Sequence, residues 1–273
     1  MNTNKNYKNS VFMSLFGDKD NLLELYNAIQ NTNYSKDTEI QITTLEDVLF
    51  MEQINDISFL IDDKIVVLIE HQSTINENMP LRMLLYMARV YEKITGNKDL
   101  YRKNRITIAR PEFIVLYNGR DEYPDKQTLK LSEMFALHGK NYPVNLELTV
   151  QIYNINKGCN PEITNKSKTL DGYEVFIAAI RDYEKTMNRD EAIKQAVDDC
   201  VKRNILKKFL ENNSSEVRNM LLTEWDWDTA LKVREEEAME KAKEKIFALW
   251  EKGVSLSDAK KILYGNNFVK TVK

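Results

Sequence analysis

The sequence predicts an α/β fold in which a central mixed sheet is flanked by helices and followed by an all-helical carboxy-terminal region. Three observations predict it. Short runs rich in Ile, Val, Leu and Phe, typical of buried strands, occupy residues 54–61, 65–72 and 111–119. A helical pattern over residues 79–95 lies between the second run and the third. From residue 172 onward the patterns are helical throughout.

The first and last elements follow from periodicity and from turn residues. Apolar side chains recur on one side of residues 10–30, which predicts a helix with a break at Gly17-Asp18. The helix over 79–95 opens at Met79-Pro80, where proline suits the first turn. The remaining expected elements are strands at 43–51 and 144–155, and helices at 173–187, 189–213, 215–253 and 255–263.

The change from mixed to helical patterns predicts three regions. We expect an α/β core over residues 1–170 and a helical subdomain over 171–225. Residues 226–273 are expected to form a helical tail. Pairing with a second copy of the chain as a homo-oligomer is preferred for it over the alternative, half of a helix-turn-helix at residues 246–263. The chain of 273 residues is long enough for one large domain and such an appendage.

The composition excludes several classes of protein. A hydrophobic fraction of 42% with 30% charged residues indicates a globular chain, and no apolar run is long enough to cross a membrane. The amino terminus has no apolar signal region, so we expect a cytoplasmic protein. Two cysteines and two histidines exclude a disulfide framework and a thiolate zinc cluster. A metal would need oxygen ligands, which favours magnesium, manganese or calcium.

Charge is segregated along a chain whose net charge is -3. Residues 89–110 contain seven basic and two acidic side chains, whereas residues 224–245 contain eight acidic and five basic ones. An acidic protein can therefore still present an electropositive face.

Carboxylates stand at the ends of the second and third strand runs. If the hairpin between them turns through three residues, 62–64, then Glu70 lies directly across from Asp56. Two like charges about 5 Å apart at Cβ destabilise the sheet unless a cation neutralises them. A two-residue turn would bring Asn55 across from Glu70 instead. The alternative explanation is that both carboxylates stand where strands emerge into water.

The segment "FLIDDKIVVLIEHQSTINENMPLRMLLYMARVYEKI" closely resembles the bacterial Rpn family of recombination-promoting nucleases and transposases, within the PD-(D/E)XK nuclease superfamily. Two later segments, "PEFIVLYNGRDEYPDKQTLKLSEMF" and "CVKRNILKKFLENNSSEVRNMLLTEWDWDTAL", are similar to the same family. The resemblance extends from about Val11 to Glu240. It implies a PD-(D/E)XK nuclease-like core with an active site on the hairpin.

The resemblance implies a magnesium site, in which manganese can substitute. Its ligands would be Asp56, Glu70 and the backbone carbonyl of His71, with Glu24 as the carboxylate of the first helix. The superfamily's lysine is replaced by Gln72, which can orient the attacking water but adds no positive charge. Strand alternation puts the His71 side chain off the Glu70 face, which favours a packing role for it over that of a general base.

The helix after the motif contains candidate DNA contacts. Arg82, Tyr86 and Arg89 are spaced for one helix face, and Leu81, Leu84, Leu85 and Ala88 for another. A guanidinium matches phosphate bidentately, so Arg82 is the favoured contact. Tyr86 either meets DNA or caps the core, and Ser73 is a further phosphate or water contact.

The sequence thus predicts a magnesium-dependent DNA endonuclease of low sequence specificity. Family resemblance links it to DNA recombination, mobile elements or defence. The alternative is a catalytically silent DNA-binding or assembly protein that retains the nuclease fold.

Overall fold

The computed structural model describes residues 10–43, 56–71, 76–99, 101, 103–136, 143–251 and 254. Its helices are α1 (Val11–Phe16), α2 (Lys19–Gln30), α3 (Met79–Asp99), α4 (Pro161–Thr164), α5 (Lys168–Tyr183), α6 (Arg189–Lys202) and α7 (Lys207–Glu251), with the 3₁₀ helix η3 (Leu131–Met134). Its strands are β1 (Gln41–Thr43), β2 (Asp56–Ile61), β3 (Lys64–His71), β4 (Arg110–Tyr117), β5 (Lys126–Lys130) and β6 (Thr149–Asn154).

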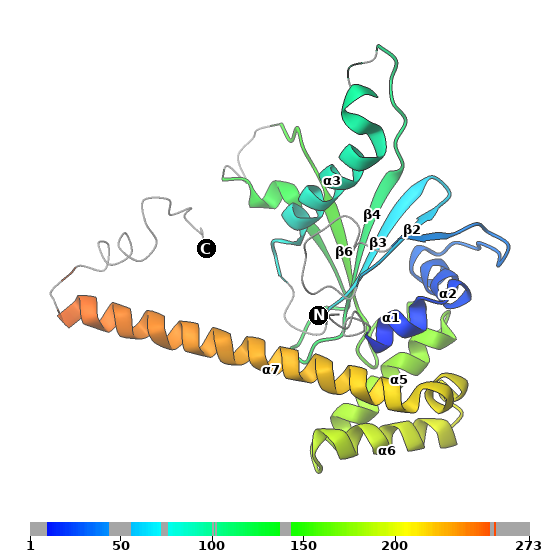
Figure 1. The fold of residues 1–273 in the computed structure, drawn as a ribbon, viewed down its shortest axis with the longest axis vertical. Coiled ribbons are helices and arrows are strands. Elements are labelled where there is room, and N and C mark those ends of the chain that lie inside the picture. Colours follow the sequence, from blue (N-terminus) through cyan, green and yellow to red (C-terminus); the bar gives the residue numbers. More distant parts are fainter. Residues whose placement is uncertain are drawn as a thin grey trace, which may run out of the picture. The chain divides into compact units, whose positions relative to one another are not determined.

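The strands form one mixed sheet of six strands in the order β1-β2-β3-β4-β6-β5. β3 pairs with β4 in parallel, and β4 pairs with β6 in parallel. The other pairs are antiparallel. A parallel pair needs a long crossover, and α3 supplies it between β3 and β4 (Figure 1). The α/β architecture expected from the sequence is confirmed.

Two hydrophobic cores bury the two faces of the sheet. Ile57, Phe59 and Ile61 of β2 pack in the core that also contains apolar side chains of α1, α2 and α5. Ile65 and Val67 of β3 pack in the other core, beneath α3. Side chains alternate along a strand, so the uninterrupted apolar runs serve both faces. Burial on both faces explains why these strands read as continuous apolar runs.

The chain divides into two compact units, residues 1–222 and 223–273. The sequence suggested a separate helical subdomain from residue 171, and this boundary differs from the observed one. Tyr173 and Phe176 of α5 are buried in the same core as Phe59 of β2, so α5 belongs to the first unit. The division at residue 223 lies close to the expected start of the tail at 226.

Many elements occupy the ranges that the sequence predicts, but the helix expected at 189–213 is interrupted: α6 ends at Lys202 and α7 begins at Lys207, with positive φ at Asn204 and Leu206 between them. The break between α1 and α2 falls at Gly17-Asp18, and the Asp18 side chain accepts hydrogen bonds from the backbone of Asp20 and Asn21 to cap α2. The sequence missed β5, whose residues "KQTLK" are mostly polar. Residues 44–55 and 255–263, expected to contain strand and helix, lie outside the described residues.

The register of the β2–β3 hairpin corrects the expectation of a three-residue loop. Ile61 pairs with Lys64, so the turn contains only Asp62 and Asp63, and Asp56 pairs with Ile69. A direct cross-strand pair of Asp56 and Glu70 is therefore wrong, and the two-residue turn given as the alternative is the observed one. Asp56 and Glu70 are offset by one residue and occupy alternate faces of the hairpin. The turn residues have φ of 48° and 56°. Positive φ at both central positions is the signature of a type I′ turn, whose twist matches that of the strands better than a longer loop does.

The turn predicts the effect of glycine at position 63. Left-handed backbone strains any residue with a Cβ, so Asp63→Gly is expected to raise the free energy of unfolding by up to about 1 kcal/mol. Urea unfolding followed by circular dichroism measures it. The control Asp63→Val should lower stability, because a β-branched side chain tolerates positive φ poorly. A stabilising Asp63→Val would contradict the two-residue turn.

Candidate functional site

The candidate site lies at one edge of the sheet, by which we mean the end at which β3 and β4 have their last residues, and not an outer strand. Glu70 and His71 are the last residues of β3 and pair with Leu116 and Tyr117 of β4. Because β2 is antiparallel to β3, its first residue, Asp56, begins at the same edge. The fold therefore brings the backbone of the two predicted metal ligands, Asp56 and Glu70, to one end of the hairpin.

The structure describes the backbone of Asp56, Glu70 and His71, while Gln72 and Ser73 lie outside the described residues. The roles of Asp56, Glu70, His71 and Gln72 at the metal site, and of Ser73 as a DNA contact, therefore stay predictions. Among the residues whose side chains are described, no group of three or more His, Cys, Asp or Glu is arranged to hold a metal ion.

Glu24, the further ligand that the family resemblance implies, is half-buried and bound to the start of α5. Its carboxylate accepts hydrogen bonds from Ser167 Oγ at 2.8 Å and from the Thr169 backbone N–H at 3.1 Å. Ser167 is the N-cap of α5 and accepts from the Leu170 backbone N–H. Glu24 thus supplies negative charge at a helix amino terminus, which is stabilising.

This contact predicts that Glu24 contributes to stability. Glu24→Ala leaves the Thr169 N–H without its acceptor and is expected to lower the free energy of unfolding by about 1–3 kcal/mol. Thermal and urea unfolding measure it. The matched variant Glu24→Gln keeps an acceptor oxygen and should lose clearly less. Equal losses from the two variants would mean that packing, and not the hydrogen bonds, makes the contribution.

The predicted DNA contacts on α3 do not share one exposed face, which corrects the sequence interpretation. Tyr86 is only 4% exposed and lies in the core beneath α3, so the packing alternative holds for its ring. Arg82 is half-buried, with Nη1 3.4 Å from Met79 Sδ. Arg89 is exposed.

The apolar stripe of α3 that meets the sheet also differs from the expected one. Leu81 and Leu85 are 42% and 57% exposed. The buried side is formed by Met79, Met83 and Met87 together with Tyr86. Two apolar stripes exist in this helix, and flexible methionines fill the irregular space over the strands.

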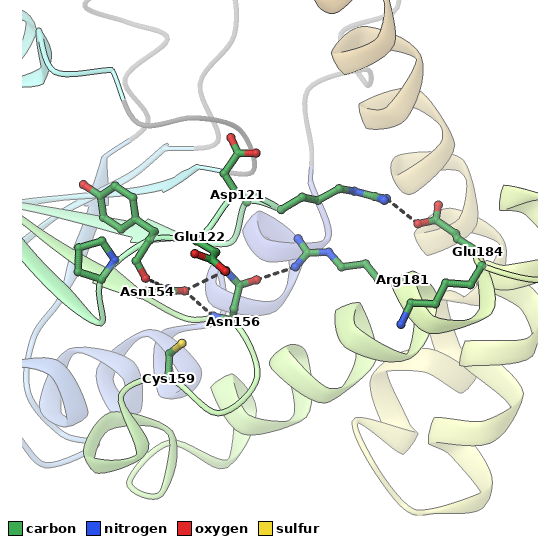
Figure 2. Close-up of a pocket in the computed structure, with 12 residues that line it drawn as sticks. Asp121, Glu122, Asn154, Asn156, Cys159, Arg181 and Glu184 are labelled. Carbon is green, nitrogen blue, oxygen red and sulfur yellow. Dashed lines mark hydrogen bonds and ion pairs between the residues drawn. The ribbon is translucent and has the colours of Figure 1, made fainter.

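A cavity of about 900 Å³ lies beyond the ends of β4 and β6 (Figure 2). The loops after β4 and β6 and the end of α5 form its walls. It is lined by Gly119, Arg120, Asp121, Glu122, Tyr123, Pro124, Asn154, Asn156, Cys159, Arg181, Glu184 and Lys185. Tyr117, the last residue of β4, pairs with both His71 and Asn154. The cavity thus opens at the same edge of the sheet as the candidate metal ligands.

Arg181 of α5 holds the two loops of the cavity together. It donates from Nη1 to Asn156 Oδ1 at 2.6 Å and from Nη2 to the carbonyl of Asn118. Asn156 in turn donates from its backbone N–H and from Nδ2 to Asn154 Oδ1, at 3.0 and 2.9 Å. Asn154 Nδ2 donates to the Tyr123 carbonyl at 2.8 Å. Figure 2 shows this network between Arg181 and the loop side chains.

Charges in the cavity wall balance one another. Glu184 accepts from Arg120 Nη2 at 2.6 Å and from Arg189. Burial, and then a hydrogen bond to Asp125, raises the pKa of the Cys159 thiol, so Cys159 stays protonated at neutral pH. Burial likewise raises the pKa of the Glu174 carboxyl, which accepts from the Gly158 backbone N–H at 2.7 Å. Because these charged groups are paired with one another or buried, the cavity wall is a structural network and not an anion-binding site.

Sequence reasoning missed this cavity. Asn118-Gly119 is predicted as a turn. The one available signal is that asparagines stand at the ends of two strands: Asn118 after β4, Asn154 as the last residue of β6, and Asn156 after it. Arg181 is distant in sequence, and only the docking of α5 reveals its contacts.

The fold and the hairpin define a class of protein: a mixed sheet flanked by helices, with a helical carboxy-terminal region, consistent with a PD-(D/E)XK-like nuclease fold. Residues 37–170 match the model of the family described as "Putative transposase, YhgA-like", so this part of the chain is similar to that family. The match spans just under half of the chain, from before β1 into α5. It confirms the resemblance to Rpn proteins and transposases.

No curated protein and no solved structure matches the chain. Within the described ranges, every helix is too short or too polar to span a membrane.

Proposed function

We propose that this protein is a metal-dependent DNA endonuclease that hydrolyses phosphodiester bonds with low sequence specificity. The observation that supports it most is the hairpin, which brings the backbone of Asp56 and Glu70 to one sheet edge within the segment that matches the transposase family. The match to the transposase family suggests a role connected with mobile elements and contact with DNA. We infer that it acts in the cytoplasm.

By their types, the residues at this edge would suit magnesium. The register offsets Asp56 and Glu70 by one position, onto alternate faces of the hairpin, so one ion would hold both carboxylates only where their side chains turn around the strand ends. The His71 carbonyl would be a further oxygen ligand, the type that Mg²⁺ prefers, and positions would remain for water. The bound ion would lower the pKa of a water and offset charge on the phosphate. Gln72 would orient the attacking water by hydrogen bonding, without the positive charge of a lysine. Arg82, in the first turn of α3, would contact a phosphate of the same strand.

The test is nicking of supercoiled plasmid with magnesium or manganese. Asp56→Ala and Glu70→Ala are each expected to reduce the rate at least about 100-fold, because each removes a ligand of the metal ion that would offset the negative charge of the transition state. Chelation of the metal should abolish nicking by the native protein. Circular dichroism spectra establish that the variants remain folded.

The matched control is Asp37→Ala, an exposed carboxylate in the loop after α2, which should nick at the native rate. Equal nicking by the native protein and both hairpin variants would overturn the site assignment. DNA binding without cleavage by any protein would instead support the alternative, a catalytically silent DNA-binding or assembly protein, which the replacement of lysine by Gln72 favours.

We also propose that the segment after residue 223 mediates self-association. Met239 and Ile246 of α7 are exposed and stand seven residues apart, with Ala242 and Leu249 between and after them at coiled-coil spacing. Burying such an apolar stripe against a second copy of the chain removes it from water, which lowers the free energy of the helix.

The variant Met239→Lys/Ile246→Lys should convert the oligomer to a monomer, because it places charge in the apolar stripe. Light scattering coupled to size-exclusion chromatography measures the mass. Glu240→Lys, one exposed position off the stripe, is the control and should leave the mass unchanged. A monomeric native protein would contradict the proposal.

A further inference from the structure

We propose that the loop between α3 and β4 is a second DNA-binding element, which grips the phosphate backbone of a duplex about nine base pairs from the candidate cleavage edge. The proposal rests on the proposed function and names how that site holds its substrate. We call this element the α3–β4 loop; its described residues are Tyr101 and 103–109.

The loop presents an aromatic ring and two cations to solvent. Tyr101 is 90% exposed, so its ring makes almost no contribution to packing. Lys103 and Arg105 are exposed as well, and Ile108 is half-exposed. Exposed basic side chains clustered on one part of a surface are typical of regions that contact nucleic-acid phosphates.

The charge of this region is unbalanced. Seven basic and two acidic residues lie between Arg89 and Arg110, in a chain of net charge -3. Arg110 is neutralised by Glu112 at 2.7 Å. Among the side chains that the structure describes, no carboxylate pairs with Lys103 or Arg105. A local excess of positive charge attracts phosphates even when the protein as a whole is acidic.

The base of the loop is fixed to the first unit. Tyr91 Oη of α3 donates to the Ala109 carbonyl at 2.7 Å. The Arg110 backbone N–H donates to the Asp63 carbonyl in the β2–β3 turn at 3.0 Å. Figure 1 shows the end of α3 and the chain after it reaching past the strands. The loop therefore projects from a rigid base, at the sheet end opposite the candidate site.

The length of α3 sets the distance between the two contacts. The helix starts beyond the carboxyl end of β3 and returns the chain to the start of β4. Its 21 residues span about 30 Å at 1.5 Å per residue. Duplex DNA rises about 3.4 Å per base pair, so about nine base pairs cover that distance. Phosphate contacts contain no sequence information, which agrees with low specificity.

The test is equilibrium binding of the full-length protein to a labelled 30-base-pair duplex, in chelator, across a salt series. Lys103→Ala/Arg105→Ala is expected to weaken binding and to reduce the slope of log K against log salt by about 2, since each lost phosphate contact removes about 0.9. The charge-preserving variant Lys103→Arg/Arg105→Lys should restore the slope. An 8-base-pair duplex is too short to reach both contacts. The loss of affinity caused by the loop variant should therefore be smaller on this duplex than on the 30-base-pair one.

The control Lys202→Ala/Arg203→Ala removes equal charge from an exposed site at the end of α6 and should leave the slope unchanged. An unchanged slope for the loop variant, or an equal change in this control, would overturn the proposal. Because binding is measured without divalent metal, the outcome is independent of cleavage. If the native protein nicks plasmid but the loop variant binds DNA normally, only the proposal about the α3–β4 loop is wrong. If the loop variant binds DNA more weakly but no protein nicks plasmid, only the proposed nuclease activity is wrong.

Discussion

The parallel pairing of β3 with β4 is the constraint on which the rest of the structure depends. Parallel neighbours cannot be joined by a tight turn, so the chain has to cross the sheet through α3. That crossing covers one face of the sheet, and α1, α2 and α5 cover the other. Both strands also end at the same edge, and the hairpin partner β2 begins there. One pairing thus determines where functional groups from separate segments can meet.

The second structural dependence is the docking of α5 across the first core. Its amino terminus is held by Glu24 of α2, and Arg181 near its other end holds the loops after β4 and β6. Both contacts pair a charged group with backbone atoms, which makes them stronger than neutral hydrogen bonds. The helix therefore ties the amino-terminal helices to the edge of the sheet where the candidate site lies.

The sequence predicted what apolar patterning determines and missed what depends on geometry between segments. β2, β3 and β4 were predictable because their apolar runs are continuous. The hairpin register was not, since one residue in the turn changes every pair and left-handed backbone at Asp62 and Asp63 has no unique signature. On α3, two apolar stripes were available, and only the fold shows that Met83 is buried while Leu85 is 57% exposed. The contacts of Glu24 and Arg181 needed the fold itself.

The outer strand β5 has a consequence for how copies of this protein meet. It has a lysine at each end, Lys126 and Lys130. Charged outer strands are poor templates for a strand from another molecule. Growth by sheet extension, the route to insoluble fibres, is therefore disfavoured along β5.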